Sequence, residues 1–242
     1  MAPIAQWIER RPPKHEIEVR FLLGAQRLNG SPDLLGEPFA CFSDLNTGFL
    51  LYIEDVSVVG GGMIILLDQD GVLADFEQGF VNNWRSKNPH EVCVSIEDRK
   101  NFYIRDDYPE YLRGKIMNIQ GSPGFYENLP PIAGAIEAYK TLLDLGHEVF
   151  ICTAPLSKYE NCVLEKYKWV EKHLGREATK LIVLTGDKTL VMGDILIDDR
   201  PEVEGVVTPA WRHILYSAPY NAHVKNKKRL SWDMDWRKVL EI

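Results

Sequence analysis

Acidic, hydroxyl and basic side chains follow four apolar stretches of the chain, and their types are those that handle phosphate and a metal ion. In chain order they are Asp68 and Asp70 after MIILL, Thr153 after EVFIC, Lys188 after LIVL, and Asp198 and Asp199 after DILI. Four carboxylates brought close together repel one another, and a divalent cation removes that conflict. An all-oxygen ligand set suits Mg²⁺, which takes one or two carboxylates, several waters and a substrate phosphate oxygen. The set therefore predicts a magnesium-dependent phosphoryl-transfer site.

The spacing of Asp68 and Asp70 predicts that the two acids share the chemistry. Residues i and i+2 point the same way along an extended chain, so both carboxyl groups can face one substrate. We expect Asp68 to attack phosphorus and form an aspartyl phosphate. Asp70 would protonate the leaving alkoxide and then deprotonate the water that hydrolyses the intermediate. Lys188 would neutralise the phosphate from another side, while the Thr153 hydroxyl and nearby backbone N–H groups hold a third oxygen.

A parallel sheet is needed to position these side chains. Short apolar strands are expected at 63–67, 147–152, 181–184 and 211–216, and the stretch 191–197 leads into a further strand. These strands alternate with helical patterns at 134–145, 160–174 and 233–240. Such alternation indicates crossover units. In open parallel sheets, ligands bind at the carboxyl ends of the strands. The sequence thus predicts an α/β fold with a Rossmann-like parallel sheet flanked by helices.

The chain divides into three parts by its sequence pattern. Prolines and glycines interrupt every short apolar stretch of residues 1–62, so we expect an irregular, poorly structured extension, at best with a loose hairpin over 49–59. Translation could itself start at Met63. Residues 63–78 and 131–242 form the expected catalytic core. Residues 79–130 show helical patterns near 77–87 and 107–118 without strands, which predicts a small helical cap that closes over the site and excludes water.

Bulk composition excludes several classes of partner. A net charge of −7 argues against a nucleic-acid polymer or an anionic membrane as the main partner, because both favour a basic surface. The four cysteines lie far apart with no CxxC pair, so neither a zinc site nor a disulfide framework is indicated. No apolar run reaches the ~18 residues needed to cross a bilayer. We expect a cytoplasmic protein, and a homodimer is left open.

Four motifs occur in an order that resembles a known superfamily. DQDGVLADF, ICTAP, GDKT and ILIDDRP are similar to the motifs of the haloacid dehalogenase (HAD) phosphatases. The segments EKYKWVEKHLG and SWDMDW bring the resemblance closest to the 5′(3′)-deoxyribonucleotidases, over about residues 63–240. The resemblance implies Mg²⁺-dependent dephosphorylation of small (deoxy)nucleoside monophosphates.

The resemblance also implies roles for individual residues. Asp68 would be nucleophile and metal ligand, Asp70 acid/base with its backbone carbonyl on Mg²⁺, and Asp199 the remaining metal ligand, supported by Asp198. The implied phosphate-binding residues are Thr153, Ala154, Lys166 and Lys188, and the implied nucleoside pocket consists of Phe76, Phe102, Tyr103, Ile104 and Gln120.

Three positions depart from the family pattern. Gln120 stands where the mammalian enzymes carry a pocket tryptophan, Ala154 replaces a serine, and Gly186 replaces an arginine. The loss of a stacking ring and a guanidinium leaves the base preference, the choice of deoxy or ribo sugar, and the choice of 5′ or 3′ phosphate open.

Other readings of the same residues remain at this point. The protein could be a phosphatase for another small phosphomonoester, a non-catalytic receiver-like phosphoacceptor module, or a dehalogenase, although a dehalogenase would not need Asp70. Lys188 could be a surface lysine, and Lys166 could lie on a solvated helix face with Glu165 and Lys168. Structural packing is the alternative for Phe102 and Tyr103. It is the favoured interpretation for Trp232, Trp236 and Cys152.

Overall fold

The structure is a computed structural model, and it describes residues 62–157 and 159–242. The irregular extension predicted over 1–62 lies outside the described residues except for Gly62, and the hairpin predicted over 49–59 lies outside them entirely. No helix within the described part of the chain is both long and apolar enough to cross a membrane.

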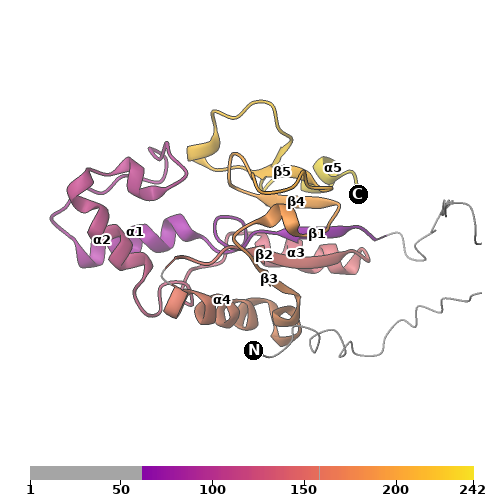
Figure 1. Ribbon diagram of the computed structural model, residues 1–242, viewed down its shortest axis with the longest axis horizontal. Coiled ribbons are helices and arrows are strands. Elements are labelled where there is room, and N and C mark those ends of the chain that lie inside the picture. The colour runs from indigo at the N-terminus through magenta and orange to yellow at the C-terminus, as the bar shows by residue number, and fades with distance from the viewer. Residues whose placement is uncertain (1–61, 158) are drawn as a thin grey trace, which may run out of the picture. The chain divides into compact units, whose positions relative to one another are not determined.

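Six parallel strands form the sheet, in the order β3-β2-β1-β4-β5-β6 (Figure 1). Their bounds are β1 (Ile64–Leu67), β2 (Glu148–Thr153), β3 (Ile182–Leu184), β4 (Ile195–Asp198), β5 (Arg212–Tyr216) and β6 (Arg229–Leu230). The central strand β1 pairs with β2 on one side and with β4 on the other, so that Leu67 lies opposite both Ile151 and Ile197. The predicted parallel sheet is confirmed. Strand β6 was not predicted, because two residues are too few to show a strand pattern.

Alternate residues of the strands pack into different apolar clusters, as expected when successive side chains point to opposite faces. Ile65, Leu67 and Ile197 belong to the larger cluster, which also takes the buried residues of the main helices. Leu66 and Leu196 belong to a smaller cluster that is completed by residues such as Trp211. Both faces of the central strands are therefore covered, which explains why their sequences are continuously apolar.

Three helices of the core lie where the sequence predicts them, two of them with bounds close to the prediction. They are α3 (Ala135–Asp144), α4 (Tyr159–Leu174) and α5 (Trp236–Leu240). Helix α5 begins at Trp236 and not at 233 as predicted, because a turn in which Met234 N–H donates to Ser231 O (3.3 Å) precedes it. Trp232 and Trp236 are both buried and meet edge to face at 5.8 Å, so the packing interpretation of these tryptophans is confirmed.

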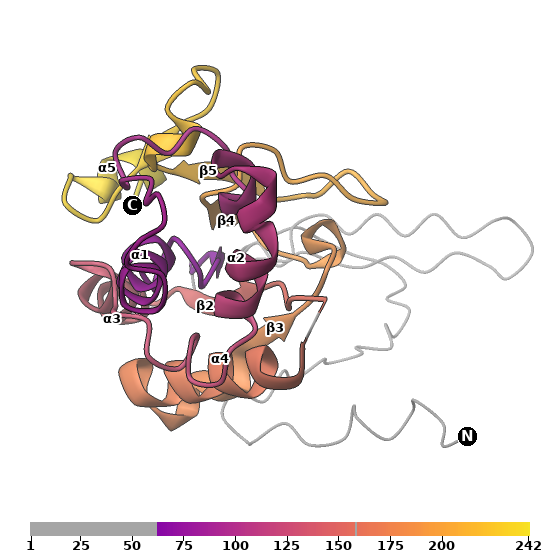
Figure 2. The same ribbon diagram turned by 90° about the vertical axis from the view of Figure 1, so that its left-hand side faces the viewer.

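Residues 79–130 lie beyond the carboxyl ends of the strands, where α1 (Phe76–Lys87) and α2 (Arg113–Gln120) face the edge of the sheet (Figures 1 and 2). The predicted helix over 107–118 is wrong in its first half. That stretch contains the last residue of one short 3₁₀ helix, η2 (Ile104–Asp107), and the whole of a second, η3 (Glu110–Leu112), before α2 begins. Pro109 explains the break, because a proline disfavours helical geometry in the residue before it, and Tyr108 is extended.

The two connections between the core and residues 79–130 lie side by side. Asp75 N–H donates to Pro130 O (2.7 Å), and Ile132 N–H donates to Leu73 O (2.8 Å). Gly79 packs directly against the Leu129 side chain and leaves no room for a Cβ atom. The two ends of the segment are therefore adjacent in space, and its assignment as a closing cap stays a prediction.

Candidate active site at the carboxyl edge of the sheet

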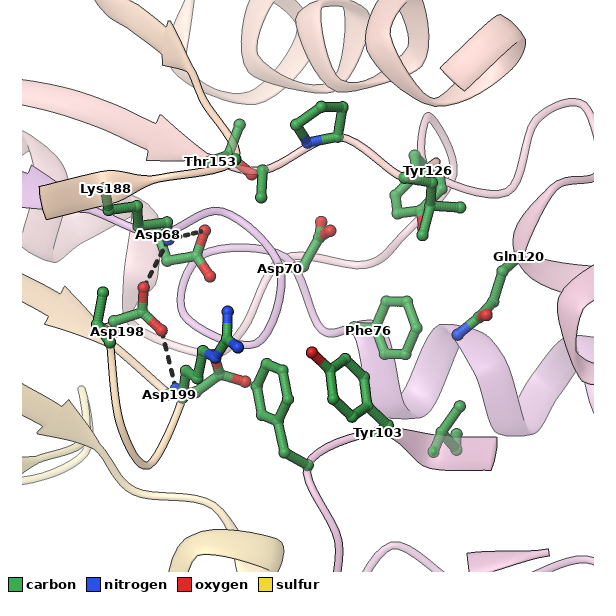
Figure 3. A pocket seen from close by; sticks show the side chains of 18 of the residues that line it. Asp68, Asp70, Phe76, Tyr103, Gln120, Tyr126, Thr153, Lys188, Asp198 and Asp199 are labelled. Atoms are coloured by element: carbon green, nitrogen blue, oxygen red, sulfur yellow. Dashed lines mark hydrogen bonds and ion pairs between the residues drawn. The ribbon is translucent and has the colours of Figure 1, made fainter. Parts of the chain in front are cut away.

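A cavity of about 460 Å³ opens where the strands end beneath α1 and α2 (Figure 3). Every site residue predicted from the sequence lines it: Asp68, Asp70, Phe76, Phe102, Tyr103, Ile104, Gln120, Thr153, Ala154, Lys166, Lys188, Asp198 and Asp199. The structure therefore brings together groups that come from β2, β4, α1, α2 and α4 and from the turns and loops between the elements, including the turn after β1.

Three carboxylates converge at the floor of the cavity. Asp68 follows β1, and Asp198 and Asp199 lie at the end of the adjacent strand β4, so that one oxygen from each lies within 4.8 Å of the other two. Burial raises the pKa of Asp68 to about 6, with Asp198 adding to the rise and Lys188 opposing it. Burial, Asp198 and Asp68 raise the pKa of Asp199 well above 3.8. Such a cluster is unfavourable without a compensating positive charge.

The oxygen atoms of this cluster fit a divalent cation. All the donors are carboxylate oxygens, which suit hard cations. Asp199 Oδ1 is buried and has no hydrogen-bond partner among the described residues, so it is available as a ligand. The residues present can therefore hold a divalent metal ion.

Lys188 supplies a positive charge to two of the acids. Its Nζ lies 2.9 Å from Asp68 Oδ1 and 2.5 Å from Asp198 Oδ2, and the residue is only 8% exposed. Burial opposes its charge, but Asp198 and Asp68 together raise its pKa above 10.5, so the ammonium stays protonated. The alternative of a solvated surface lysine is wrong. Although burial works against ionisation of Asp198, Lys188 lowers the pKa of that carboxyl group below 3.8.

Lys166 contacts Asp70 in the same way as Lys188 contacts Asp68. Its Nζ lies 2.7 Å from Asp70 Oδ2 and 2.7 Å from Thr153 Oγ1, with 1% of the residue exposed. The solvated-face alternative is wrong for Lys166 and for its neighbour Glu165, which is buried and accepts hydrogen bonds from Gly124 N–H (2.6 Å) and Tyr126 N–H (3.0 Å). Lys188 thus contacts Asp68, and Lys166 contacts Asp70.

A tight turn after β1 holds the two acids in place. Gly71 has φ of +82° and donates its N–H to Ala74 O (2.8 Å). A Cβ atom at position 71 would collide with the Asp199 carboxylate. The glycine of the DQDG motif is therefore required both by backbone conformation and by the close approach of the metal-ligand candidate.

Aromatic side chains line the cavity away from the acids (Figure 3). Phe76, at the start of α1, meets the ring of Phe125 edge to face at 5.5 Å. Tyr103 is 48% exposed, and the Arg105 guanidinium lies 4.9 Å from its ring centre. Gln120 lies across from them at the end of α2. The cavity has a charged end and an aromatic end, as a pocket for a phosphorylated compound with a flat apolar part would.

Sequence reasoning missed several residues that line the same cavity, including Tyr126, Arg200 and Tyr220. Arg200 lies within the ILIDDRP motif, but no role was assigned to it. Tyr220 follows β5 and donates a hydrogen bond from its hydroxyl group to Asp199 Oδ2. The rule that ligand-binding groups follow the carboxyl ends of strands, applied to β5 as well, would have pointed to this segment.

Comparison with known proteins gives the family. The family model described as "5' nucleotidase, deoxy (Pyrimidine), cytosolic type C protein" matches residues 62–241. The chain belongs to this family. The match covers almost all of the described residues and confirms the resemblance seen in the four motifs.

Two named relatives agree with the family model. A protein of Bordetella bronchiseptica named "Putative 5'(3')-deoxyribonucleotidase" is 57% identical over 178 residues, which cover 74% of this chain and 95% of the relative. The human cytosolic-type 5'(3')-deoxyribonucleotidase is 44% identical over 187 residues, covering 73% and 92%. The solved structure of a HAD family hydrolase from Deinococcus radiodurans covers 74% of this chain and 95% of its own, with a TM-score of 0.49 and 14% identity.

Proposed function

We propose that the protein is a Mg²⁺-dependent phosphomonoesterase of the 5′(3′)-deoxyribonucleotidase type, which dephosphorylates (deoxy)nucleoside monophosphates through an aspartyl-phosphate intermediate. The observation that carries the proposal is the convergence of Asp68, Asp198 and Asp199 within 4.8 Å at the floor of the cavity. Membership of the nucleotidase family and the names of the relatives support the substrate class.

In this proposal Asp68, Asp199 and the backbone carbonyl of Asp70 hold Mg²⁺, and Asp198 supports them through Lys188. When bound, the cation supplies charge neutralisation to the phosphate oxygens. Lys188, Thr153 and Lys166 bind the remaining phosphate oxygens, together with backbone N–H groups near Ala154. The two buried ammonium groups favour an anionic ligand in a protein whose net charge is −7.

Asp68 and Asp70 carry out the bond-making steps. A carboxylate oxygen of Asp68 attacks phosphorus while the ester P–O bond breaks, and the leaving alkoxide takes the proton of Asp70. Asp70 then accepts a proton from water, whose oxygen attacks the aspartyl phosphate and releases inorganic phosphate. Lys166 fixes Asp70 Oδ2 at 2.7 Å. Asp70 Oδ1 has no hydrogen-bond partner among the described residues, which leaves it available for the proton transfer.

The nucleoside would occupy the aromatic end, against Phe76, Phe102, Tyr103, Ile104 and Gln120. Two departures from the family pattern lie on this wall or at its rim. Gln120 offers an amide in place of a stacking ring. Gly186 lines the cavity, and a Cβ atom at this position would have no other atom within 4 Å. There is therefore room at position 186 for the first atoms of an arginine side chain.

We further propose that residues 79–130 act as a cap that closes over the bound nucleotide. The adjacent connections at Asp75–Pro130 and Leu73–Ile132 would serve as its hinge. The cytoplasmic location remains a prediction, because the human relatives are named as cytosolic and mitochondrial types. The homodimer also remains a prediction.

Phosphate release from a panel of nucleoside monophosphates and sugar phosphates, with and without EDTA, tests the function. We expect turnover of nucleotides that EDTA abolishes and that Asp68→Asn reduces to background. Asp144→Asn, the same change at an exposed position of α3, is the matched control and should stay active.

The possible outcomes separate the rival functions. A preference for sugar phosphates would favour a phosphatase for another phosphomonoester. Stable phosphorylation without turnover would favour a receiver-like module. Full activity of Asp68→Asn would refute the nucleophile.

A further inference from the structure

Asp199 is held from two sides by the short 3₁₀ helix η6 (Pro219–Asn221) that follows β5. The Tyr220 hydroxyl donates to Asp199 Oδ2, and Asn221 Nδ2 donates to Asp199 O at 2.7 Å. Tyr220 is 3% exposed and Asn221 is fully buried. These contacts fix the side chain and the backbone of Asp199 together. Only Oδ1, which has no partner among the described residues, remains for a ligand.

The Tyr220 ring is itself held by residues of the 79–130 segment. The Arg99 guanidinium carbon lies 5.3 Å from the centre of this ring, and the Phe102 ring meets it edge to face at 6.0 Å. A guanidinium over an aromatic face is attracted by the negative face of the ring. The segment 79–130 therefore contacts the candidate metal ligand Asp199 through a single intervening side chain.

Arg99 is anchored on both sides of the boundary between this segment and the core. Its Nε and Nη2 lie 2.8 Å and 3.0 Å from the two carboxylate oxygens of Glu77, and its Nη1 contacts Asp107. The Arg99 side chain is only 1% exposed. A two-point contact between a guanidinium and a carboxylate fixes direction as well as distance. Arg99 therefore has little freedom to leave the Tyr220 ring unless the segment moves.

We propose that Tyr220 is a positioning residue that orients Asp199 for the metal ion, and that Arg99 couples the position of the 79–130 segment to this orientation. The inference rests on the proposed role of Asp199 as a metal ligand. Groups that orient metal ligands commonly contribute about 10- to 100-fold to metal affinity. With the segment docked, Arg99 and Phe102 hold the ring, and the hydroxyl binds Oδ2 of Asp199 and leaves Oδ1 for the ion. With the segment displaced, the ring loses this support and the metal site is incomplete.

Direct binding of Mn²⁺ to the full chain, followed by the EPR signal of the free ion, tests the first part. Tyr220→Phe removes only the hydroxyl group and should weaken Mn²⁺ binding by about tenfold or more. Tyr216→Phe is the matched control, because this buried tyrosine packs against Trp232 with its ring tilted (centroids 5.4 Å apart) and does not contact Asp199 through its side chain, and it should bind Mn²⁺ like the wild type. Unchanged binding by Tyr220→Phe would overturn the positioning role.

A double-mutant cycle with Arg99→Lys tests the coupling. Arg99→Lys keeps the charge but loses the planar contact with the ring, and it should weaken Mn²⁺ binding in the wild-type background but not in Tyr220→Phe. Equal effects in both backgrounds would overturn the coupling through Tyr220. Urea unfolding of each variant verifies that the compared proteins are folded.

Asp199→Asn separates this inference from the proposed function. Loss of Mn²⁺ binding in Asp199→Asn together with normal binding in Tyr220→Phe would overturn the inference alone. Normal binding in Asp199→Asn would overturn the proposed metal site and with it the inference.

Discussion

Replacing Asp68 by asparagine should stabilise the metal-free protein at neutral pH while it removes catalysis. The pKa of Asp68 is about 6 in the folded protein, against 3.8 ordinarily, because the carboxyl group is buried. Below pH 3.8 the group is protonated in both the folded and the unfolded states and has no effect. Between the two values the folded state keeps a proton that the unfolded chain has lost, so stability falls as pH rises. Above pH 6 the loss is complete. At about 1.4 kcal/mol per pKa unit, it amounts to about 3 kcal/mol.

Urea unfolding in EDTA at pH 4 and pH 7.5 measures this loss. Wild type and Asp68→Asn should have similar free energies of unfolding at pH 4, whereas the variant should be more stable by up to about 3 kcal/mol at pH 7.5. Added Mg²⁺ should stabilise the wild type and narrow the gap. Asp144→Asn keeps Asp68 and should lose stability between pH 4 and pH 7.5 as the wild type does. A difference between wild type and Asp68→Asn that is the same at both pH values would refute the reasoning that burial of an ionised Asp68 is costly.

Three further predictions concern the turn, the rim and the core. Gly71→Ala should destabilise the fold by at least about 1–2 kcal/mol, the cost of a left-handed backbone for a residue with a Cβ atom. It should also weaken Mn²⁺ binding by displacing the Asp199 carboxylate. Urea unfolding measures the first effect and EPR titration the second. Wild-type stability and wild-type Mn²⁺ affinity in Gly71→Ala would contradict the predicted collision between the added Cβ atom and Asp199. Gly186→Arg should lower the KM for nucleoside monophosphates by about tenfold, because a charge-assisted hydrogen bond contributes about 1.5–3 kcal/mol; steady-state kinetics with an unchanged KM would count against it. Burial raises the pKa of the Cys152 thiol to about 12, so mass spectrometry after iodoacetamide treatment should find Cys152 unmodified in the native protein and labelled in urea, with half-buried Cys93 as the positive control. Labelling of native Cys152 would show that this part of the core opens.

Local sequence patterns determined which groups lie at the carboxyl edge of the sheet. MIILL, EVFIC and DILI are apolar because both faces of these strands are covered, and the polar residues after them mark where the strands end. The glycine after DQD marks the turn that holds Asp68 and Asp70. These features depend on neighbours in the chain, so the fold class, the acid cluster and Thr153 could be predicted without coordinates.

Sequence patterns were less informative about the precise ends of the helices. The apolar spacing over 107–118 indicated a helix, but Pro109 divides the stretch into short 3₁₀ turns before α2. The spacing over 233–240 did not reveal the turn that delays α5 to Trp236. In both cases a local backbone restraint outweighed the periodicity, because helix propagation needs each residue to adopt helical geometry in turn.

Only the tertiary structure decided which charges meet. Lys166 and Asp70 are 96 residues apart, and Lys166 has charged sequence neighbours that suggested a solvated face, yet it is buried against Asp70 and Thr153. The contacts of Tyr220 with Asp199 and of Arg99 with Tyr220 likewise join segments that no short motif connects. A residue's type and spacing report its local geometry. Its partners across the sheet depend on strand order and on how the 79–130 segment lies over the strand ends, and these are set by packing of the whole chain.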